Sequence, residues 1–210
     1  DNAEVRGEAD IYDDAEVYGD VKVYGNVKVR GYAKVFGKAK VYDNAIIYDH
    51  ARVYGVAAVY GDAVVYGNAE VYNGAKVGGL ARVYDNAKVF DNANVYGDAK
   101  VCGKAQVYWC AQVYWCAQVL DNAEVCGNAE VCGGAEICDN AGVYANAKIY
   151  GHALVTDNAN VYANAVVRDD AEVRGNADVY DDAEVYGDAK IYGNAKVSGN
   201  AKVCGKAKVY

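Results

Sequence analysis

The chain has 210 residues and a biased composition, with no Pro and no Met but with 23 Gly and 21 Tyr. Such a bias is typical of a repeat protein rather than of an ordinary globular core. The formal net charge of −8 argues against a nucleic-acid partner, and no apolar run approaches the roughly 20 residues of a membrane-spanning helix.

A six-residue repeat begins at Ala3, runs through 34 complete hexads to residue 206, and starts again as AKVY. Numbered one to six from Ala3, the positions read small, any, aliphatic, any, turn, turn. Position one is Ala except at Val21 and Val27, and position three is always Val or Ile. Because these apolar positions alternate with a polar position two, each hexad predicts a short strand with one buried face.

Positions five and six predict a bend after every strand. Position five is Gly 19 times and Asp 10 times, and position six is mostly Asn or Asp. These residues form tight turns, and Gly adopts positive φ at no steric cost. A bend in every hexad, without hairpin spacing, predicts a chain that coils with three sides, so that three hexads make one coil.

This pattern resembles the hexapeptide-repeat left-handed parallel β-helix, in which an aliphatic residue points inward and a small residue lies two positions earlier. It is also similar to uncharacterised bacterial and phage proteins with A-x-V-Y-G-N repeats. The resemblance implies an all-β, single-domain, triangular solenoid over residues 1–210, with about 18 residues per coil and about 11 coils. At ~4.8 Å per coil, the rod would be roughly 55 Å long. We expect no loop insertions and no caps. Two interpretations explain missing caps: the segment is part of a longer rod, or the rod stacks on copies of itself.

Many members of this family are acyltransferases or γ-type carbonic anhydrases. The resemblance ties these activities to a His base in a cleft made by loops and neighbouring subunits, or to zinc held by three His. Here His50 and His152 occupy turn positions on different corners, more than five coils apart, and no inserted loop forms the wall of a pocket. We therefore expect no enzyme, no cofactor and no small-molecule substrate. The alternative is an acyltransferase or carbonic-anhydrase-like trimer with a cleft between subunits.

One corner carries a candidate cation site. Asp121, Asp139 and Asp157 each lie three hexads from the next and should stack, which would suit an ion such as calcium. The same carboxylates would also suit hydrogen bonds to turn amides, which leaves two interpretations open.

The seven cysteines include no two that are three hexads apart. We therefore expect mostly free thiols, because stacked partners within disulfide reach are missing. Free thiols favour a reducing or anaerobic setting, although an extracellular fibre and a cytoplasmic scaffold both remain possible.

Position four should point outward, and it is Tyr in 20 of its 35 occurrences. Stacking every third hexad places a run of six aromatic residues on one face: Tyr18, Phe36, Tyr54, Tyr72, Phe90 and Tyr108. Such a ladder would support parallel strands and shield their hydrogen bonds. A long exposed aromatic stripe also predicts lateral contact between rods, or an adhesive module that binds other partners.

The stretch YWCAQVYWC places Trp109 and Trp115 at position five, on neighbouring corners of one coil. Cys110 and Cys116 are then too far apart for a thiolate pair. With Tyr108 and Tyr114, the two Trp form an apolar girdle that we expect to be a lateral contact point between rods.

Position two differs in charge between the two ends of the chain. It is acidic in the first coil at Glu4, Asp10 and Glu16, and it is basic in the last coil at Lys196, Lys202 and Lys208. These residues are candidates for end-to-end contact, which would be heterologous and non-closing and would therefore build a filament. The sequence favours a non-enzymatic structural rod, fibre or filament whose partner is itself, stacked head to tail with possible lateral bundling.

Overall fold

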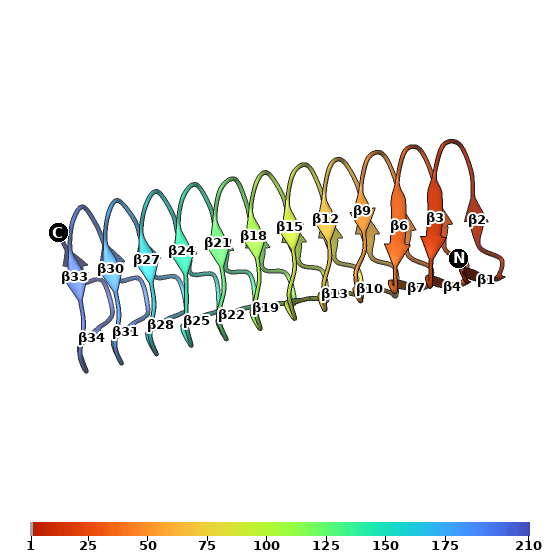
Figure 1. The fold of residues 1–210 in the computed structure, drawn as a ribbon. Helices are drawn as coiled ribbons and strands as arrows, with labels where there is room; N and C mark the ends of the chain where they lie inside the picture. Colours follow the sequence, from red (N-terminus) through yellow and green to blue (C-terminus); the bar gives the residue numbers. More distant parts are fainter. Residues whose placement is uncertain (1) are drawn as a thin grey trace.

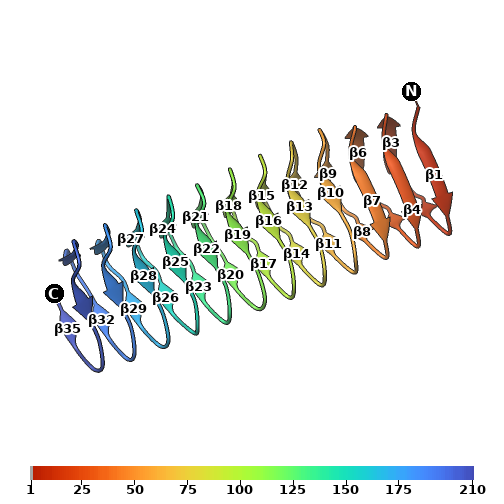
Figure 2. The same cartoon turned by 90° about the horizontal axis from the view of Figure 1, so that it is seen from below.

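The computed structural model describes residues 2–210, which form one continuous β-solenoid (Figure 1). The chain winds through about 11 turns of ~18 residues, and its three sides are parallel β-sheets. Figure 2 shows the same coils from below, with the N- and C-termini at opposite ends of the rod. The predicted all-β fold, coil size and number of coils are confirmed.

The three sides are named face A, face B and face C. Face A contains β1 (Glu4–Gly7), β4 (Lys22–Gly25), β7 (Lys40–Asp43), β10 (Ala58–Val59), β13 (Lys76–Val77), β16 (Asn94–Val95), β19 (Gln112–Val113), β22 (Glu130–Val131), β25 (Lys148–Ile149), β28 (Val166–Val167), β31 (Glu184–Val185) and β34 (Lys202–Val203). Face B contains β2 (Asp10–Ile11), β5 (Lys28–Val29), β8 (Ile46–Ile47), β11 (Val64–Val65), β14 (Arg82–Val83), β17 (Lys100–Val101), β20 (Gln118–Val119), β23 (Glu136–Ile137), β26 (Leu154–Val155), β29 (Glu172–Val173), β32 (Lys190–Ile191) and β35 (Lys208–Val209). Face C contains β3 (Glu16–Gly19), β6 (Lys34–Gly37), β9 (Arg52–Val53), β12 (Glu70–Val71), β15 (Lys88–Val89), β18 (Gln106–Val107), β21 (Glu124–Val125), β24 (Gly142–Val143), β27 (Asn160–Val161), β30 (Asp178–Val179) and β33 (Lys196–Val197).

Each strand pairs in parallel with the strands one coil before and one coil after it. The register joins residues three hexads apart, so that Gln106 pairs with Glu124 and Val107 with Val125. The residues of each hexad position therefore stack in a column along each face or corner of the rod.

Position five bends the chain at all three corners. Every residue there, from Gly7 to Gly205, has a positive φ. This backbone conformation is accessible to Gly and is tolerated by Asp, which explains why these two residues occupy most of the position. Stacking adds a second constraint, because a Cβ on Gly25 would lie 2.6 Å from the carbonyl oxygen of Asp43 in the next coil.

The core consists of positions one and three. The Ala and Val/Ile side chains from Val21 to Ile191 are almost fully inaccessible to solvent, and the described residues include no buried polar or charged side chain. Val21 and Val27 are also fully buried, so the first coils accommodate a larger residue in the Ala position. Residues 2–210 include no helix with the length and apolar character needed to cross a membrane.

Candidate functional site

Face C carries the longest aromatic ladder. Five consecutive stacked pairs join its six rings, from Tyr18 to Tyr108, with centroids 4.8 to 5.1 Å apart and interplanar angles of 1° to 5°. The ladder follows from the register, because position four of one coil lies directly over position four of the next. The predicted stack of six rings is confirmed.

The ladder on face C is interrupted after Tyr108. Cys126 occupies the next place and is only 4% exposed. In the following coil, the ring of Tyr144 turns toward Gly142 and occupies the space that a Cβ on this residue would need. Position four therefore does not always carry an exposed side chain, since Cys126 is covered although it occupies this outward column.

Shorter ladders occupy the other two faces. Face A stacks Tyr24, Tyr42 and Tyr60 at 5.3 Å, and the ring of Tyr60 then covers Gly78. On the same face, Tyr96 stacks on Tyr114 at 5.0 Å. Arg side chains extend several stacks through cation–π contacts, at Arg30 over Tyr48, Arg168 over Tyr186 and Arg174 over Tyr192. Position four thus forms ladders on all three faces, and the one on face C is the longest.

Packing within the ladders raises the pKa of several tyrosines. Partial burial, followed by the neighbouring Glu70 carboxylate, raises the pKa of Tyr54 to about 12. The Tyr54 hydroxyl donates to Glu70 Oε2 at 3.3 Å, which favours the neutral phenol. Burial is also the leading cause of the raised pKa of Tyr72.

Trp109 and Trp115 are the most unusual residues of the corners. Both have φ of 58°, a conformation that costs about 1–2 kcal/mol for a residue with a Cβ. Their side chains are 57% and 62% exposed. Each ring packs edge-on against the preceding tyrosine, with centroids 5.4 Å apart at Tyr108 and 5.3 Å at Tyr114. The corners therefore hold two large exposed rings in a conformation that Gly would adopt at lower cost.

All seven cysteines are free thiols, which agrees with the sequence-based expectation. Cys110, Cys116 and Cys204 are exposed, whereas Cys126 and Cys132 are buried. Burial raises the pKa of the buried thiols, so they remain neutral and weakly nucleophilic. Cys132 is 8% exposed and, like Cys126, is buried although it occupies position four.

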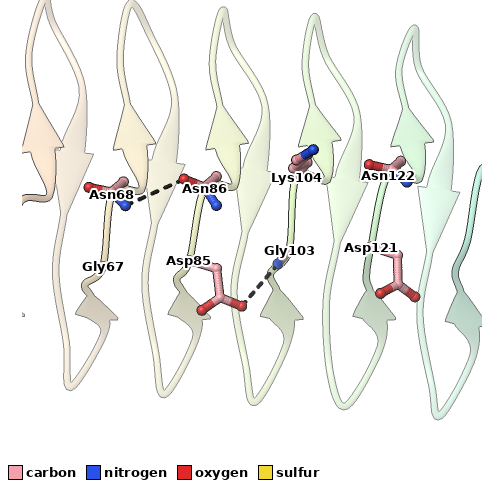
Figure 3. A pocket seen from close by; sticks show the side chains of 8 residues that line it. All are labelled: Gly67, Asn68, Asp85, Asn86, Gly103, Lys104, Asp121 and Asn122. Atoms are coloured by element: carbon pink, nitrogen blue, oxygen red, sulfur yellow. Dashed lines mark hydrogen bonds between the residues drawn. The ribbon is translucent and has the colours of Figure 1, made fainter.

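The corner between faces B and C carries the polar ladders drawn in Figure 3. Asp85 accepts a hydrogen bond from the Gly103 amide at 3.2 Å, and Asn68 donates to Asn86 at 3.4 Å. In the next coil, Lys104 takes the place of an Asn, so the side-chain ladder stops there (Figure 3). The residues drawn line an open surface hollow of about 440 Å³.

The cation candidates Asp121, Asp139 and Asp157 stack at this corner. The Oδ2 atom of each carboxylate accepts a hydrogen bond from a backbone N–H of the next coil, at 3.3, 3.3 and 2.9 Å respectively. The Thr156 hydroxyl and the Asp157 amide lower the pKa of Asp139. Residues 2–210 contain no group of three or more His, Cys, Asp or Glu side chains placed to hold a metal ion. This geometry supports the second interpretation, in which the Asp column satisfies turn amides.

The two histidines lie apart. The His50 ring stacks on Tyr32 with centroids 5.0 Å apart. His152 belongs to a different corner, where its ring covers Gly134. Each histidine therefore packs against its own column.

The predicted end-to-end contact residues lie at the two ends of the rod. Glu4, Asp10 and Glu16 are exposed on β1, β2 and β3. Lys196, Lys202 and Lys208 are exposed on β33, β34 and β35. Each of these six strands has only one strand neighbour in its sheet.

Position two also forms ion pairs between successive coils. Lys34 contacts Glu16 at 2.8 Å, and Lys202 contacts Glu184 at 2.8 Å. The reverse order, with the cation in the earlier coil, occurs between Arg52 and Glu70 at 3.7 Å. Opposite charges one coil apart thus come within contact distance in either order.

Comparison of the chain with known protein families, with curated proteins and with solved structures finds no match.

Proposed function

We propose that the chain is a non-enzymatic structural rod that stacks end to end on copies of itself. The observation that carries this proposal is the pair of complementary end coils, with exposed acids on β1, β2 and β3 and exposed lysines on β33, β34 and β35. Open strand edges at both ends offer backbone groups for pairing. Charge and hydrogen bonding therefore favour the same partner, another copy of the chain.

The register specifies how the second copy would dock. A copy that continues the coil without a step sets β1 beside β33, β2 beside β34 and β3 beside β35. Three lysines then meet three acids: Lys196 with Glu4, Lys202 with Asp10, and Lys208 with Glu16. The Arg52–Glu70 contact is an intramolecular example of this order of charges. Because the two contacting surfaces differ, the assembly grows without closing.

The finer assignment to left-handed hexapeptide-repeat helices is part of this proposal. It is supported by the aliphatic and small residues that form the buried columns. A density map of the filament at side-chain detail would test the hand of the coil. A right-handed coil would reject this assignment while leaving the stacking proposal intact.

Filament formation by the 210-residue chain tests the stacking proposal. We expect electron micrographs to show rods several times the length of one chain, which shorten as salt is raised. The triple variant Lys196→Glu, Lys202→Glu and Lys208→Glu should give single rods. Adding Glu4→Lys, Asp10→Lys and Glu16→Lys to the same chain should restore filaments.

The control is Lys100→Glu, which changes the same kind of side chain far from either end. It should leave the filament length unchanged. Monodisperse single rods of the unaltered chain, at every salt concentration tested, would reject end-to-end stacking.

The non-enzymatic part of the proposal needs its own test. Acetyl-CoA binding tests for an acyltransferase, and metal analysis tests for a zinc-dependent carbonic anhydrase. We expect neither stoichiometric zinc nor saturable binding. Saturable acetyl-CoA binding that His50→Ala or His152→Ala abolishes would favour the enzyme instead.

A further inference from the structure

The position-two column of face C has an antisymmetric charge pattern about its centre. From the first coil to the last it reads Glu16, Lys34, Arg52, Glu70, Lys88, Gln106, Glu124, Gly142, Asn160, Asp178 and Lys196. Gln106 is the middle residue of these eleven, and it is uncharged. Outward from it, the charged residues that lie at equal distances on the two sides have opposite signs.

We propose that face C docks on face C of a second copy in an antiparallel arrangement, with the twofold axis passing through Gln106. Three pairs of opposite charge then face each other, and symmetry makes each pair twice: Lys88 with Glu124, Lys34 with Asp178, and Glu16 with Lys196. The other two charged residues of the column face uncharged ones, since Arg52 meets Asn160 and Glu70 meets Gly142. The arrangement brings no like charges together, and such complementarity sets the register of an interface.

Neighbouring registers are less favourable. A slip of one coil in one direction opposes Lys34 with Lys196 and leaves a single attractive pair, Arg52 with Asp178. A slip in the other direction opposes Glu16 with Asp178 and Glu70 with Glu124. A parallel arrangement with the coils level places every charge against its own copy. A parallel slip of one coil gives four attractive pairs and one repulsive pair, against six attractive contacts and no repulsive one in the antiparallel arrangement. The charges therefore select one orientation and one register.

The charges nearest the proposed axis have no ion-pair partner inside the described chain. Within residues 2–210, Lys88 and Glu124 form no salt bridge, although Arg52 and Glu70 of the same column pair with each other. Glu124 accepts only a long hydrogen bond from the Tyr108 hydroxyl, at 3.5 Å. Both charges are thus available to a partner.

Face C also provides apolar surface for such a contact. Its six stacked rings, from Tyr18 to Tyr108, run beside the charged column, and Trp109 stands exposed at the corner that follows Tyr108. Exposed aromatic side chains are typical anchors of protein interfaces. The rings would contribute affinity, while the charges would set the register.

The other two faces are less suited to the same contact. Face A has opposite charges at three mirrored positions, Glu4 with Lys202, Lys22 with Glu184 and Lys76 with Glu130, but its aromatic column is interrupted at Gly78. An antiparallel contact between two copies of face B would place Lys28 against Lys190, which have like charges. Only face C combines the antisymmetric charges with a ladder of six rings.

A charge exchange in the middle of the rod tests the proposal separately from end-to-end stacking. The host chain carries Lys202→Glu and Lys208→Glu, which change the end coil but not face C. Sedimentation should show a dimer that dissociates as salt is raised. Lys88→Glu should weaken dimerisation at least about tenfold, because two attractive contacts become repulsive. Lys88→Glu combined with Glu124→Lys should restore it.

The matched control is Lys100→Glu, which lies at position two of face B and should leave the dimer unchanged. Circular dichroism should show the same fold for all variants. A host chain that remains monomeric, or a double variant that does not regain the dimer, would overturn the proposal. Absence of filaments in the unaltered chain, together with a dimer in the host chain, would instead reject end-to-end stacking alone.

Cross-linking at the axis gives a second measurement. With Cys110, Cys116 and Cys204 changed to Ser, Gln106→Cys should form a disulfide-linked dimer under a mild thiol oxidant. Gln112→Cys, the equivalent position on face A, should not. Equal cross-linking at both positions would contradict a contact confined to face C.

Discussion

The ring of Tyr72 lies parallel to the ring of Tyr54, with centroids 4.8 Å apart and an interplanar angle of 1°, although the two residues are three hexads apart in the chain. On its other side, Tyr72 stacks on Phe90 at 4.9 Å. Tyr72 therefore lies between two other rings of the six-ring ladder, and each of these three rings belongs to a different coil.

Replacing Tyr72 with Ala removes both stacking contacts. Aromatic pairs contribute about 0.5–1.5 kcal/mol each, so we expect the free energy of unfolding to fall by about 1–3 kcal/mol. Tyr72→Phe keeps the ring and should be nearly neutral, as Phe36 and Phe90 occupy the same column. Denaturant titration of both variants provides the measurement. Equal losses for Ala and Phe would show that the hydroxyl, rather than the stack, stabilises the coil.

The core should tolerate a larger residue at position three better than at position one. Ala111 and Val113 are both fully buried on face A near the middle of the rod. Ala111→Leu overfills a site between packed coils and should lower the free energy of unfolding by about 1–3 kcal/mol. Val113→Ile should cost less, because Ile137 already occupies position three in the neighbouring sheet. Thermal unfolding would show the difference, and a larger shift for Val113→Ile would contradict this account of the packing.

Trp109 should be replaceable by Gly with little effect on the fold. Gly removes the cost of the positive φ, which is about 1–2 kcal/mol, while the lost edge-on contact with Tyr108 costs about 0.5–1.5 kcal/mol. The net change in the free energy of unfolding should stay within about 1 kcal/mol. Trp109→Val is the control, since a β-branched residue at this φ should be clearly destabilising. Rods that carry both Trp109→Gly and Trp115→Gly should associate laterally less than the unaltered rods. Unchanged bundling would contradict the hypothesis that the Trp girdle is a lateral contact point.

Alkaline pH should destabilise the rod through its tyrosine ladders. The pKa of Tyr54 is raised from 10.0 to about 12, so the folded state binds its proton more tightly than the unfolded state does. The resulting stability is fully present below pH 10 and is lost as the pH rises toward about 12. Unfolding free energies measured across this window, together with phenolate absorbance, should show the loss. Tyr54→Phe should reduce it, and an identical pH profile for this variant would contradict the assignment.

The six-residue period of the sequence predicts the backbone because every hexad repeats the same pattern of residue types. Each hexad has an inward Val or Ile, a small Ala and a turn pair. This combination fits one coil geometry, and no insertion disturbs the register. The columns at positions two, four, five and six follow directly from that coil. Hence the six-ring stack and the corner placement of Trp109 and Trp115 could be predicted without coordinates.

Individual side-chain conformations could not be predicted in this way. Tyr144 turns toward Gly142, and Tyr60 covers Gly78, because each ring fills the volume that a missing side chain leaves. The burial of Cys126 depends on the size of its neighbours in the adjacent coils. The repeat specifies which residues are neighbours, but the volumes of several side chains together decide how those neighbours pack.

The pairing of each strand with the strands three hexads away has a mechanical consequence. Each strand is held only by the strands one coil before and after it, so a force applied to one terminus loads the outermost hexad first. A released hexad would extend by about 20 Å, at roughly 3.3–3.6 Å per residue. A rod pulled from its end should therefore unfold one hexad after another. It should lengthen in small, nearly uniform steps rather than rupture at a single force.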